Sequence, residues 1–212
     1  MKRIFQYKIG KMSHYYQLAR RVDYKIARVS YLPQSKAEMD SSFSVIKYDS
    51  IEQLSKDYDL EQNRVQIPYK DAYYINKRYF KHPIYQYQVL GICGREGVKA
   101  LAVFREQEYK GRIAVRWVDY IGWQEYMKGL ERYIEQLFED SRYEYVDFYG
   151  YGFSDACLRD AGFTEWKEGD PNVIPNYFAP FEQKNIDIWI HTPIDNVLIC
   201  KADGDQDRPN AE

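Results

Sequence analysis

The chain has 212 residues, with 30 Lys and Arg against 32 Asp and Glu, which gives a formal net charge of -2. This balance argues against a protein whose main task is to bind nucleic acid or anionic lipid, because both ligands select a positive surplus. Hydrophobic residues make up 45% of the chain, which excludes a disordered protein, and aromatic residues reach 17%, with 22 tyrosines.

Cysteine and histidine usage indicates the compartment and argues against a metal site. Cys93, Cys157 and Cys200 are widely spaced and odd in number, which favours the reducing cytosol over secretion. The histidines are isolated and no C-x-x-C pair occurs, so we expect no metal. The N-terminus lacks the apolar core of a signal peptide, and no stretch approaches the roughly 18 apolar residues of a membrane span. We therefore expect a soluble, cytoplasmic protein that neither crosses a membrane nor binds nucleic acid.

Residues 1–40 form a basic segment with few acidic residues to balance it. Met12, Tyr15, Ala19 and Val22 recur at helical spacing, which predicts a short amphipathic helix. We interpret this segment as an N-terminal extension that packs on the main domain. The alternative is an arm that binds a membrane surface or a partner protein.

The regular pattern begins at residue 43 with a predicted strand over 43–48. Ser50 follows as a helix N-cap, and Gln53 completes a capping-box pattern for a helix over 51–58. A second helix is predicted over 70–81, where the dipeptide His82-Pro83 ends it. Residues 59–69 are expected to be a loop.

The middle of the chain predicts hairpins followed by a strand–helix–strand unit. Short connections that contain glycine separate three predicted strands, which favours antiparallel hairpins. The apolar period then becomes helical, and Gly162 is expected to end the last helix as its C′ residue. In chain order we expect strands over 85–93, 98–105 and 112–121, a helix over 123–139, a strand over 144–150, a helix over 154–160, and strands over 186–191 and 196–201.

The predicted order is therefore β-α-α-β-β-β-α-β-α-β-β. A strand–helix–strand unit in one sheet requires a parallel crossover, whereas the preceding hairpins are antiparallel. We therefore expect a mixed sheet and assign the chain to the α/β class, in its α+β form with a mixed sheet.

This order resembles the GNAT acyltransferase fold, in which a hairpin-rich half leads into a β-α-β-α core. A strand followed at once by a capped helix, Ser42 to Tyr58, is similar to the start of many members. The sequence Leu158-Arg-Asp-Ala-Gly-Phe163 is similar to the family's L-x-x-x-G-F before its sixth strand. The order of elements is the more specific part of this resemblance, since a helix C-cap before a strand also explains the short motif.

Three further segments resemble GNAT-like proteins of bacterial surface-polysaccharide gene clusters. They are residues 71–121, the loop Ile174 to Phe181, and the tail Asp203 to Asn210. The resemblance covers residues 43–201 as one GNAT-like domain, with residues 1–40 as an extension and 202–212 as a polar tail. It implies transfer of an acyl group from acetyl-CoA or another acyl-CoA to the amine of an amino sugar or similar metabolite, and it allows a homodimer.

The junction after the strand 112–121 departs from the family pattern. GNAT proteins bind the pyrophosphate of CoA on backbone amides of a glycine-rich loop, because free N–H groups and a helix N-terminus favour an anion. Here the resemblance assigns this role to Tyr120, Ile121, Gly122 and Trp123, a stretch with one glycine and a bulky indole. The alternative function is therefore a non-catalytic GNAT-like binding module, for a sugar or a partner protein, that lacks a working pyrophosphate loop.

Alternation along two strands selects the candidate catalytic residues. Asp119 shares a predicted face with Ile113, Val115, Trp117 and Ile121, and a carboxylate on an apolar face is either paired or at a cleft. Asp147 lies among tyrosines on the strand 144–150 and its flanks. We predict that Asp119 and Asp147 act as the base or orient the acceptor, with Tyr149 as the acid; packing and ion-pair roles are the alternative at each position.

The remaining candidates are polar groups that would bind the substrate. Tyr145 and Tyr151 share the face of Asp147, and the tail contributes Asp205 and Arg208. A row of tyrosines suits the wall of a polar cleft, with carbohydrate as a natural occupant. The acidic tail is similar to a Ca²⁺ loop, but its second position is glycine and it has no Glu at the twelfth, so we expect no metal there.

Overall fold

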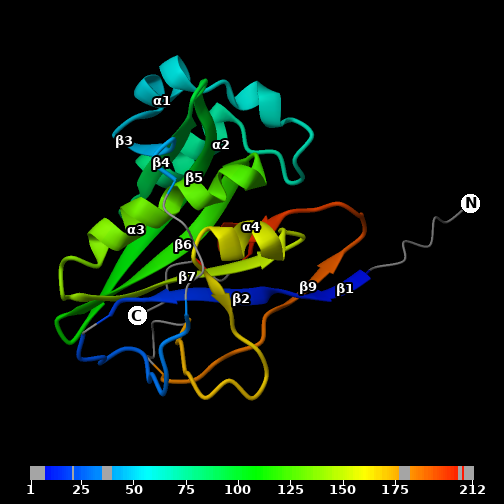
Figure 1. The fold of residues 1–212 in the computed structure, drawn as a ribbon. Coiled ribbons are helices and arrows are strands. Elements are labelled where there is room, and N and C mark those ends of the chain that lie inside the picture. The colour runs from blue at the N-terminus through cyan, green and yellow to red at the C-terminus, as the bar shows by residue number, and fades with distance from the viewer. Residues whose placement is uncertain (1–7, 21, 35–39, 177–181, 205–206, 208–212) are drawn as a thin grey trace, which may run out of the picture.

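The computed structural model describes residues 8–20, 22–34, 40–176, 182–204 and 207, which form a mixed α+β fold (Figure 1). Eight strands form one sheet, ordered β3-β4-β5-β6-β7-β2-β8, with β10 paired to β7; β1 and β9 form a separate two-stranded sheet. The main sheet consists of β2 (Ser13–Leu18), β3 (Ser44–Tyr48), β4 (Gln88–Gly94), β5 (Gly97–Tyr109), β6 (Arg112–Gly122), β7 (Tyr143–Tyr151), β8 (Thr164–Glu165) and β10 (Ile199–Cys200). The small sheet consists of β1 (Lys8–Lys11) and β9 (Trp189–Thr192).

Strand directions follow from the connections along the chain. The hairpins β4–β5 and β5–β6 are antiparallel, whereas β6 and β7 are parallel because a helical crossover joins them. The remaining strand pairs of the main sheet are antiparallel. The mixed sheet expected from the sequence is therefore confirmed.

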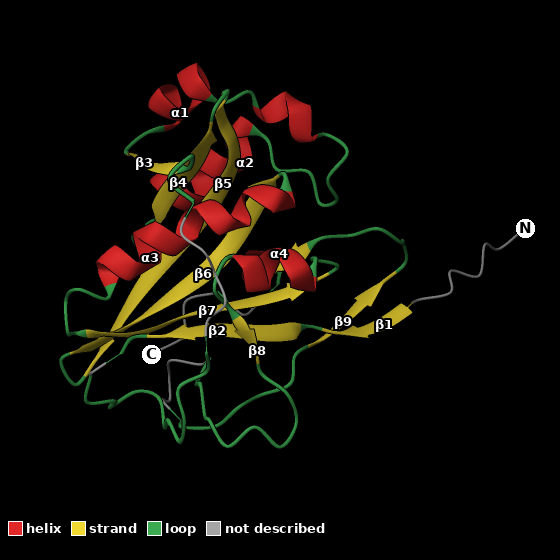
Figure 2. Ribbon diagram, viewed as in Figure 1, coloured by secondary structure: helices red, strands yellow, loops and turns green. Residues whose placement is uncertain are grey.

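Helices cover the two faces of the sheet unequally (Figure 2). The 3-10 helix η3 (Gln124–Leu130), α3 (Glu131–Leu137) and α4 (Asp155–Asp160) pack on one face, whose core includes Trp117 and Phe148. On the other face, α1 (Ile51–Asp57), η1 (Leu60–Asn63), α2 (Ala72–Ile75) and the π-helix η2 (Asn76–Phe80) cover β4 to β6. Among the described residues, no helix is long and apolar enough to cross a membrane.

Both helices predicted for the first half form, the first beginning at Ile51 as expected and the second at Ala72, two residues after its predicted start. The backbone N–H of Gln53 donates to Ser50 Oγ over 3.3 Å, so Ser50 caps α1. Asp71 caps α2, accepting from Tyr74 N over 2.7 Å, and the helix continues in π geometry to Phe80. These caps satisfy N–H groups that a first helical turn leaves without partners.

The helix predicted from Met12 to Val22 is wrong, because residues 13–18 form β2. This strand lies between β7 and β8 and pairs with β7 from Ser13 to Leu18. Tyr15 packs into the core beneath α3 and α4, and Tyr16 into a core on the opposite face. Since β2 is covered on both faces, the adjacent Tyr15 and Tyr16 are both buried, and together with Met12 and Ala19 they produce the apparent helical spacing.

The predicted common face of β6 is interrupted at Val118. Asp119 pairs with Val103 and Trp117 with Phe104, so Val118 is an extra residue in a β-bulge. A bulge shifts the alternation of side chains by one. Trp117 therefore faces α3, whereas Asp119 faces the α2 side, and the two residues do not share a face as predicted.

Candidate functional site

Strands β6 and β7 separate toward their C-terminal ends. Their pairing runs from Ile113 with Tyr143 to Trp117 with Phe148. Further along β7, Gly150 and Tyr151 pair instead with β10. The segment Ile199 to Asp203, comprising β10 and the 3-10 helix η4 (Lys201–Asp203) and called here the C-terminal strap, therefore occupies the space between the two strands.

Buried charges attach the C-terminal strap to the sheet. Lys201 is 1% exposed, and its Nζ lies 3.6 Å from Asp147 Oδ2 and 5.0 Å from the ring centre of Tyr149. Burial lowers the pKa of Lys201 to about 8, although Asp147 opposes this shift. Asp203 Oδ1 lies 2.9 Å from Lys70 Nζ. The strap thus supplies one cation and one anion to groups that water does not reach.

Asp147, predicted to be catalytic, is completely buried and lies against the cations Arg116 and Lys201 and against the His14 ring. Arg116 Nη1 lies 2.7 Å from Asp147 Oδ1, and His14 Nε2 lies 3.3 Å from Oδ2. Burial alone would raise the pKa of Asp147, but Arg116 and Lys201 outweigh it and hold that pKa well below its usual value. A carboxylate that stays ionised in this setting is a weak general base and a strong structural anchor.

Asp119 is also completely buried and has its hydrogen-bonding capacity filled by the protein. Lys70 and Tyr79 donate to its two carboxylate oxygens, and Tyr120 N donates to Oδ1 over 2.8 Å. The ion-pair partner of Asp119 is Lys70, whereas those of Asp147 are Arg116 and Lys201. The structure therefore places the two aspartates in separate ionic clusters.

A potential metal-ligand grouping surrounds Lys70. Ligand atoms of Asp119, Cys200 and Asp203 all lie within 4.8 Å of one another. Lys70 Nζ contacts both carboxylates, so an ammonium group already supplies the positive charge there. Burial raises the pKa of the Cys200 thiol well above its usual value, which makes it a poor thiolate ligand. The donor set thus fits an internal lysine better than a metal ion.

The tyrosines predicted beside Asp147 fall into two environments. Tyr149 stacks on His14 with ring centres 4.0 Å apart and donates to Ile186 O over 3.2 Å; burial raises its pKa well above the usual value. Tyr145 accepts from Arg116 and donates to Pro175 O over 2.8 Å. Tyr151, in contrast, is only partly buried and lines a surface groove. Tyr145 and Tyr149 therefore lie inside the protein, and only Tyr151 reaches a ligand-accessible surface.

The backbone amides predicted to bind a pyrophosphate are already engaged. Tyr120 N donates to Asp119, Gly122 N donates to Gln66 Oε1 over 3.1 Å, and Trp123 N donates to Lys99 O over 3.4 Å. Ile121 pairs with Leu101 within the β5–β6 ladder. These N–H groups therefore do not form an open cradle for an anion.

A groove of about 690 Å³ opens at the ends of β6 and β7, where Trp123 is 57% exposed. We call it the Trp123 groove; its walls are formed by residues 62, 63, 65, 66, 122–125, 151–152 and 196–198. Gly122 and Gly152 have φ values of +111° and +83°, and a Cβ at Gly152 would lie 2.0 Å from Val197 O. Two glycines thus allow the turns that end both strands and shape the groove.

Side-chain amides dominate the polar part of the Trp123 groove. Gln66 bridges β6, donating to Tyr120 O over 3.0 Å, and Gln124 Oε1 accepts from Ser154 N over 2.7 Å. Gln62 and Asn196 also line the groove, and no hydrogen bond from a described residue occupies their side chains. Among the described lining residues, none is Lys or Arg, and Glu125 is the one charged side chain.

Two predicted substrate-binding residues, Asp205 and Arg208, lie outside the described residues. Their neighbour Asp207 is described and 1% exposed. Its Oδ1 lies 2.7 Å from Arg105 Nη1 and its Oδ2 3.1 Å from Arg78 Nη2, while Tyr87 donates to Oδ2 over 2.7 Å. The acidic tail motif thus provides a buried ionic anchor at Asp207.

Several residues that shape this region were not predicted from the sequence. Glu144 is buried, and its carboxylate accepts from the backbone N–H groups of Lys25, Ile26 and Ala27. Gln62 and Gln66 lie in a segment predicted only as a loop. A polar residue on a predicted interior strand was an available signal for Glu144, whereas the glutamines carried none.

Comparisons with known proteins leave the function open. No model of a known protein family matches the sequence, and no curated protein matches it. Among solved structures, the chain is similar to a functionally unknown conserved protein from Staphylococcus epidermidis ATCC 12228, at 11% identity and a TM-score of 0.38. The match covers 76% of this chain and 59% of that protein, so the chain spans about three-fifths of its length. This likeness carries no functional argument.

Proposed function

We propose that the chain is a GNAT-like module without acyltransferase activity, and that it binds a neutral carbohydrate in the Trp123 groove. The sequence resemblance, the parallel β6–β7 step and the separation of these strands beyond Trp117 support the GNAT-like assignment. The same geometry gives little support to acyl transfer.

Acyl transfer needs space for acyl-CoA and backbone N–H groups that are free to bind its pyrophosphate. In this protein the space is filled and the N–H groups have protein acceptors. The C-terminal strap occupies the separation between β6 and β7, where the donor would lie, and it pairs with Gly150 and Tyr151. The amides of Tyr120, Gly122 and Trp123 have protein acceptors. An acyl-CoA would have to displace buried ion pairs before it could bind, which costs several kcal/mol for each uncompensated charge.

The exposed indole of Trp123 in an amide-rich groove is the observation that carries the proposal. A sugar ring has an apolar C–H face, which an exposed aromatic ring removes from water, and a rim of hydroxyl groups. Side-chain amides both donate and accept, so Gln62 and Asn196 match such hydroxyls. The groove has no cation among its described residues, which disfavours a phosphate or pyrophosphate and favours a neutral sugar.

The class of carbohydrate follows from the resemblance. The segments 71–121, Ile174 to Phe181 and Asp203 to Asn210 resemble proteins of bacterial surface-polysaccharide gene clusters. We therefore assign the ligand to neutral oligosaccharide units of a surface polysaccharide. The function is recognition of the sugar rather than its acylation.

Calorimetric titration of the full chain tests this proposal with maltotriose, cellotriose and chitotriose as neutral probes and acetyl-CoA as the competing ligand. We expect at least one oligosaccharide to bind. Trp123→Ala lowers the affinity for it by about tenfold or more, because the variant loses the stacking surface. Trp189→Ala is the matched control, since Trp189 is 60% exposed but lies on β9 outside the groove. It leaves the affinity unchanged.

Three outcomes would contradict the proposal. Acetyl-CoA binding followed by acylation of an amino-sugar acceptor, detected by mass spectrometry, would establish the acyltransferase instead. Absence of binding to all three oligosaccharides would refute the carbohydrate assignment. Equal loss of affinity in Trp123→Ala and Trp189→Ala would show that the groove is not the binding site.

A further inference from the structure

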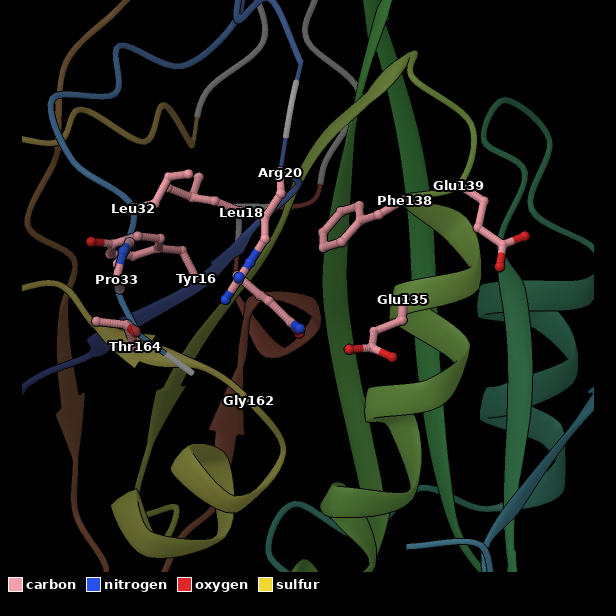
Figure 3. A pocket seen from close by; sticks show the side chains of 11 residues that line it. Tyr16, Leu18, Arg20, Leu32, Pro33, Glu135, Phe138, Glu139, Gly162 and Thr164 are labelled. Atoms are coloured by element: carbon pink, nitrogen blue, oxygen red, sulfur yellow. The ribbon is translucent and has the colours of Figure 1, made fainter. Parts of the chain in front are cut away.

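A second pocket lies between β2, β8 and α3, and it shares no lining residue with the Trp123 groove. Figure 3 shows this pocket, which has a volume of about 310 Å³ and an opening to solvent. Its size is at the lower end for sites that bind small molecules. The charges on its walls define what can bind there.

Arg20 provides the cation of this pocket. It follows directly after β2 and the buried Ala19, and Figure 3 shows its side chain reaching into the pocket. No described residue forms an ion pair or a hydrogen bond with the side chain of Arg20. No described residue therefore occupies the donors of this guanidinium, whose planar fork matches the carboxylate of a ligand.

The opposite wall is acidic. Glu135 and Glu139 line it, and Figure 3 shows the carboxylate of Glu135 facing Arg20 across the pocket. Figure 3 shows the carboxylate of Glu139 directed away from Arg20, so Glu135 is the acidic group that faces the guanidinium. Glu131 and Glu135 are four residues apart on α3, where like charges repel. Burial and then Glu135 raise the pKa of Glu131, in agreement with this repulsion. Neither Glu135 nor Glu139 has an ion-pair partner among the described residues.

Apolar and neutral polar groups complete the walls. Leu18, Leu32 and Phe138 provide apolar surface between the charged ends. Gln17 also lines the pocket, and its buried Oε1 has no hydrogen-bond partner in the described part of the chain. A buried acceptor without a donor is costly, so this part of the wall retains unused hydrogen-bonding capacity.

We infer that this pocket binds a small zwitterion, specifically an α-amino acid with an apolar side chain. An anion alone would meet the carboxylate of Glu135, and a cation alone would meet Arg20. A ligand that carries both charges pairs its carboxylate with Arg20 and its ammonium with Glu135, and its side chain lies against Leu18 and Phe138. This inference concerns a separate site and does not depend on the carbohydrate proposal.

Titration of the full chain by NMR with L-leucine, N-acetyl-L-leucine and L-leucinamide tests the inference, because the last two compounds each lack one ligand charge. L-leucine shifts the amide signals of residues 17–20 and 135–139 saturably, and each analogue binds about tenfold more weakly or worse. Arg20→Gln and Glu135→Gln each lower the affinity for L-leucine by a similar factor. Arg95→Gln, in the exposed β4–β5 turn, is the matched control and leaves the affinity unchanged.

The outcomes separate this site from simpler explanations. Equal binding of N-acetyl-L-leucine would indicate an anion site, and equal binding of L-leucinamide a cation site; either result overturns the inference. Failure of L-leucine to shift these signals also overturns it. Both substituted side chains are exposed, so the variants are expected to fold, and cooperative thermal unfolding verifies this. Trp123→Ala leaves L-leucine binding unchanged, which keeps this test independent of the carbohydrate test.

Discussion

At the level of single residues, burial controls the ionisation of His14 beside Asp147. His14 is 4% exposed, and its Nε2 lies 3.3 Å from Asp147 Oδ2. Burial lowers the pKa of His14 below 6.5, and Asp147 offsets this shift only in part. Arg116 and Lys201 repel an added proton on the ring, so the neutral imidazole is favoured in the folded protein.

This lowered pKa predicts a loss of stability on mild acidification. Below about pH 6.5 the unfolded chain binds a proton at His14 that the folded chain does not bind, so the free energy of unfolding falls as the pH falls. One such proton contributes at most about 1.4 kcal/mol per pH unit. His14→Phe keeps the stack on Tyr149 and makes the decline between pH 6.5 and 5 shallower. Urea unfolding at several pH values measures this slope.

His191 provides the control for the acid prediction because it is exposed on β9. His191→Phe should leave the slope of the wild-type protein unchanged. A slope in His14→Phe equal to that of the wild type would show that His14 does not remain neutral in the folded state.

At the level of elements, the C-terminal strap determines what the sheet can bind. It replaces the β6–β7 pairing with β10–β7 pairing, and Lys201 lies against Asp147. Just beyond it, Asp207 bridges Arg78 on η2 and Arg105 on β5. Ionic contacts therefore hold the strap at Lys201 and the chain beyond it at Asp207.

Asp207→Asn is expected to destabilise the protein strongly. The substitution leaves Arg78 and Arg105 close together without a carboxylate between them, and removing one partner of a buried ion pair costs about 3 kcal/mol or more. Urea unfolding measures the loss, and hydrogen exchange should become faster at Gly150 and Cys200 as the strap loosens. Asp195→Asn, which removes an exposed ion pair with Lys8, is the control and should change neither quantity measurably. Wild-type stability in Asp207→Asn would show that this ionic anchor does not hold the end of the chain.

At the level of the whole molecule, the segment 8–34 is part of the main fold. Strand β2 lies inside the sheet, and the backbone N–H groups of residues 25–27 bind Glu144 at the start of β7. Arg28 pairs with Val173, which joins this segment to the chain beyond β8. The fold therefore depends on contacts between segments that are far apart in the sequence.

Deletion of residues 1–19 is expected to abolish cooperative folding rather than trim an appendage. Without β2, the strand β7 loses its neighbour from Tyr145 to Gly150, and apolar residues on both faces become exposed. Near-UV circular dichroism and urea unfolding of the truncated chain measure the result. A native-like cooperative transition would contradict the role given to β2 and would support an extension that only packs on the domain.

Local patterns in the sequence predicted a substantial part of this protein. The caps at Ser50, the hairpins of β4 to β6 and the parallel β6–β7 step follow from turn residues, caps and apolar periods within short windows. The position of Asp147 among tyrosines and the bulky Trp123 at the junction after β6 were also visible in the sequence. These features depend on neighbours a few residues apart, so the sequence alone determines them.

Only the tertiary structure decided which of these groups a ligand can reach. Asp119 and Asp147 were identified as unusual, but their partners Lys70, His14 and Lys201 lie far away in sequence, and a charge pattern does not specify long-range pairs. The bulge at Val118 turned Asp119 to the other face, and a single inserted residue leaves little trace in an apolar run. Insertion of β2 into the sheet and of the strap between β6 and β7 likewise depends on contacts between distant segments. The sequence by itself thus determined the local elements and the unusual side chains, whereas long-range packing decided which became buried anchors and left Trp123 facing solvent.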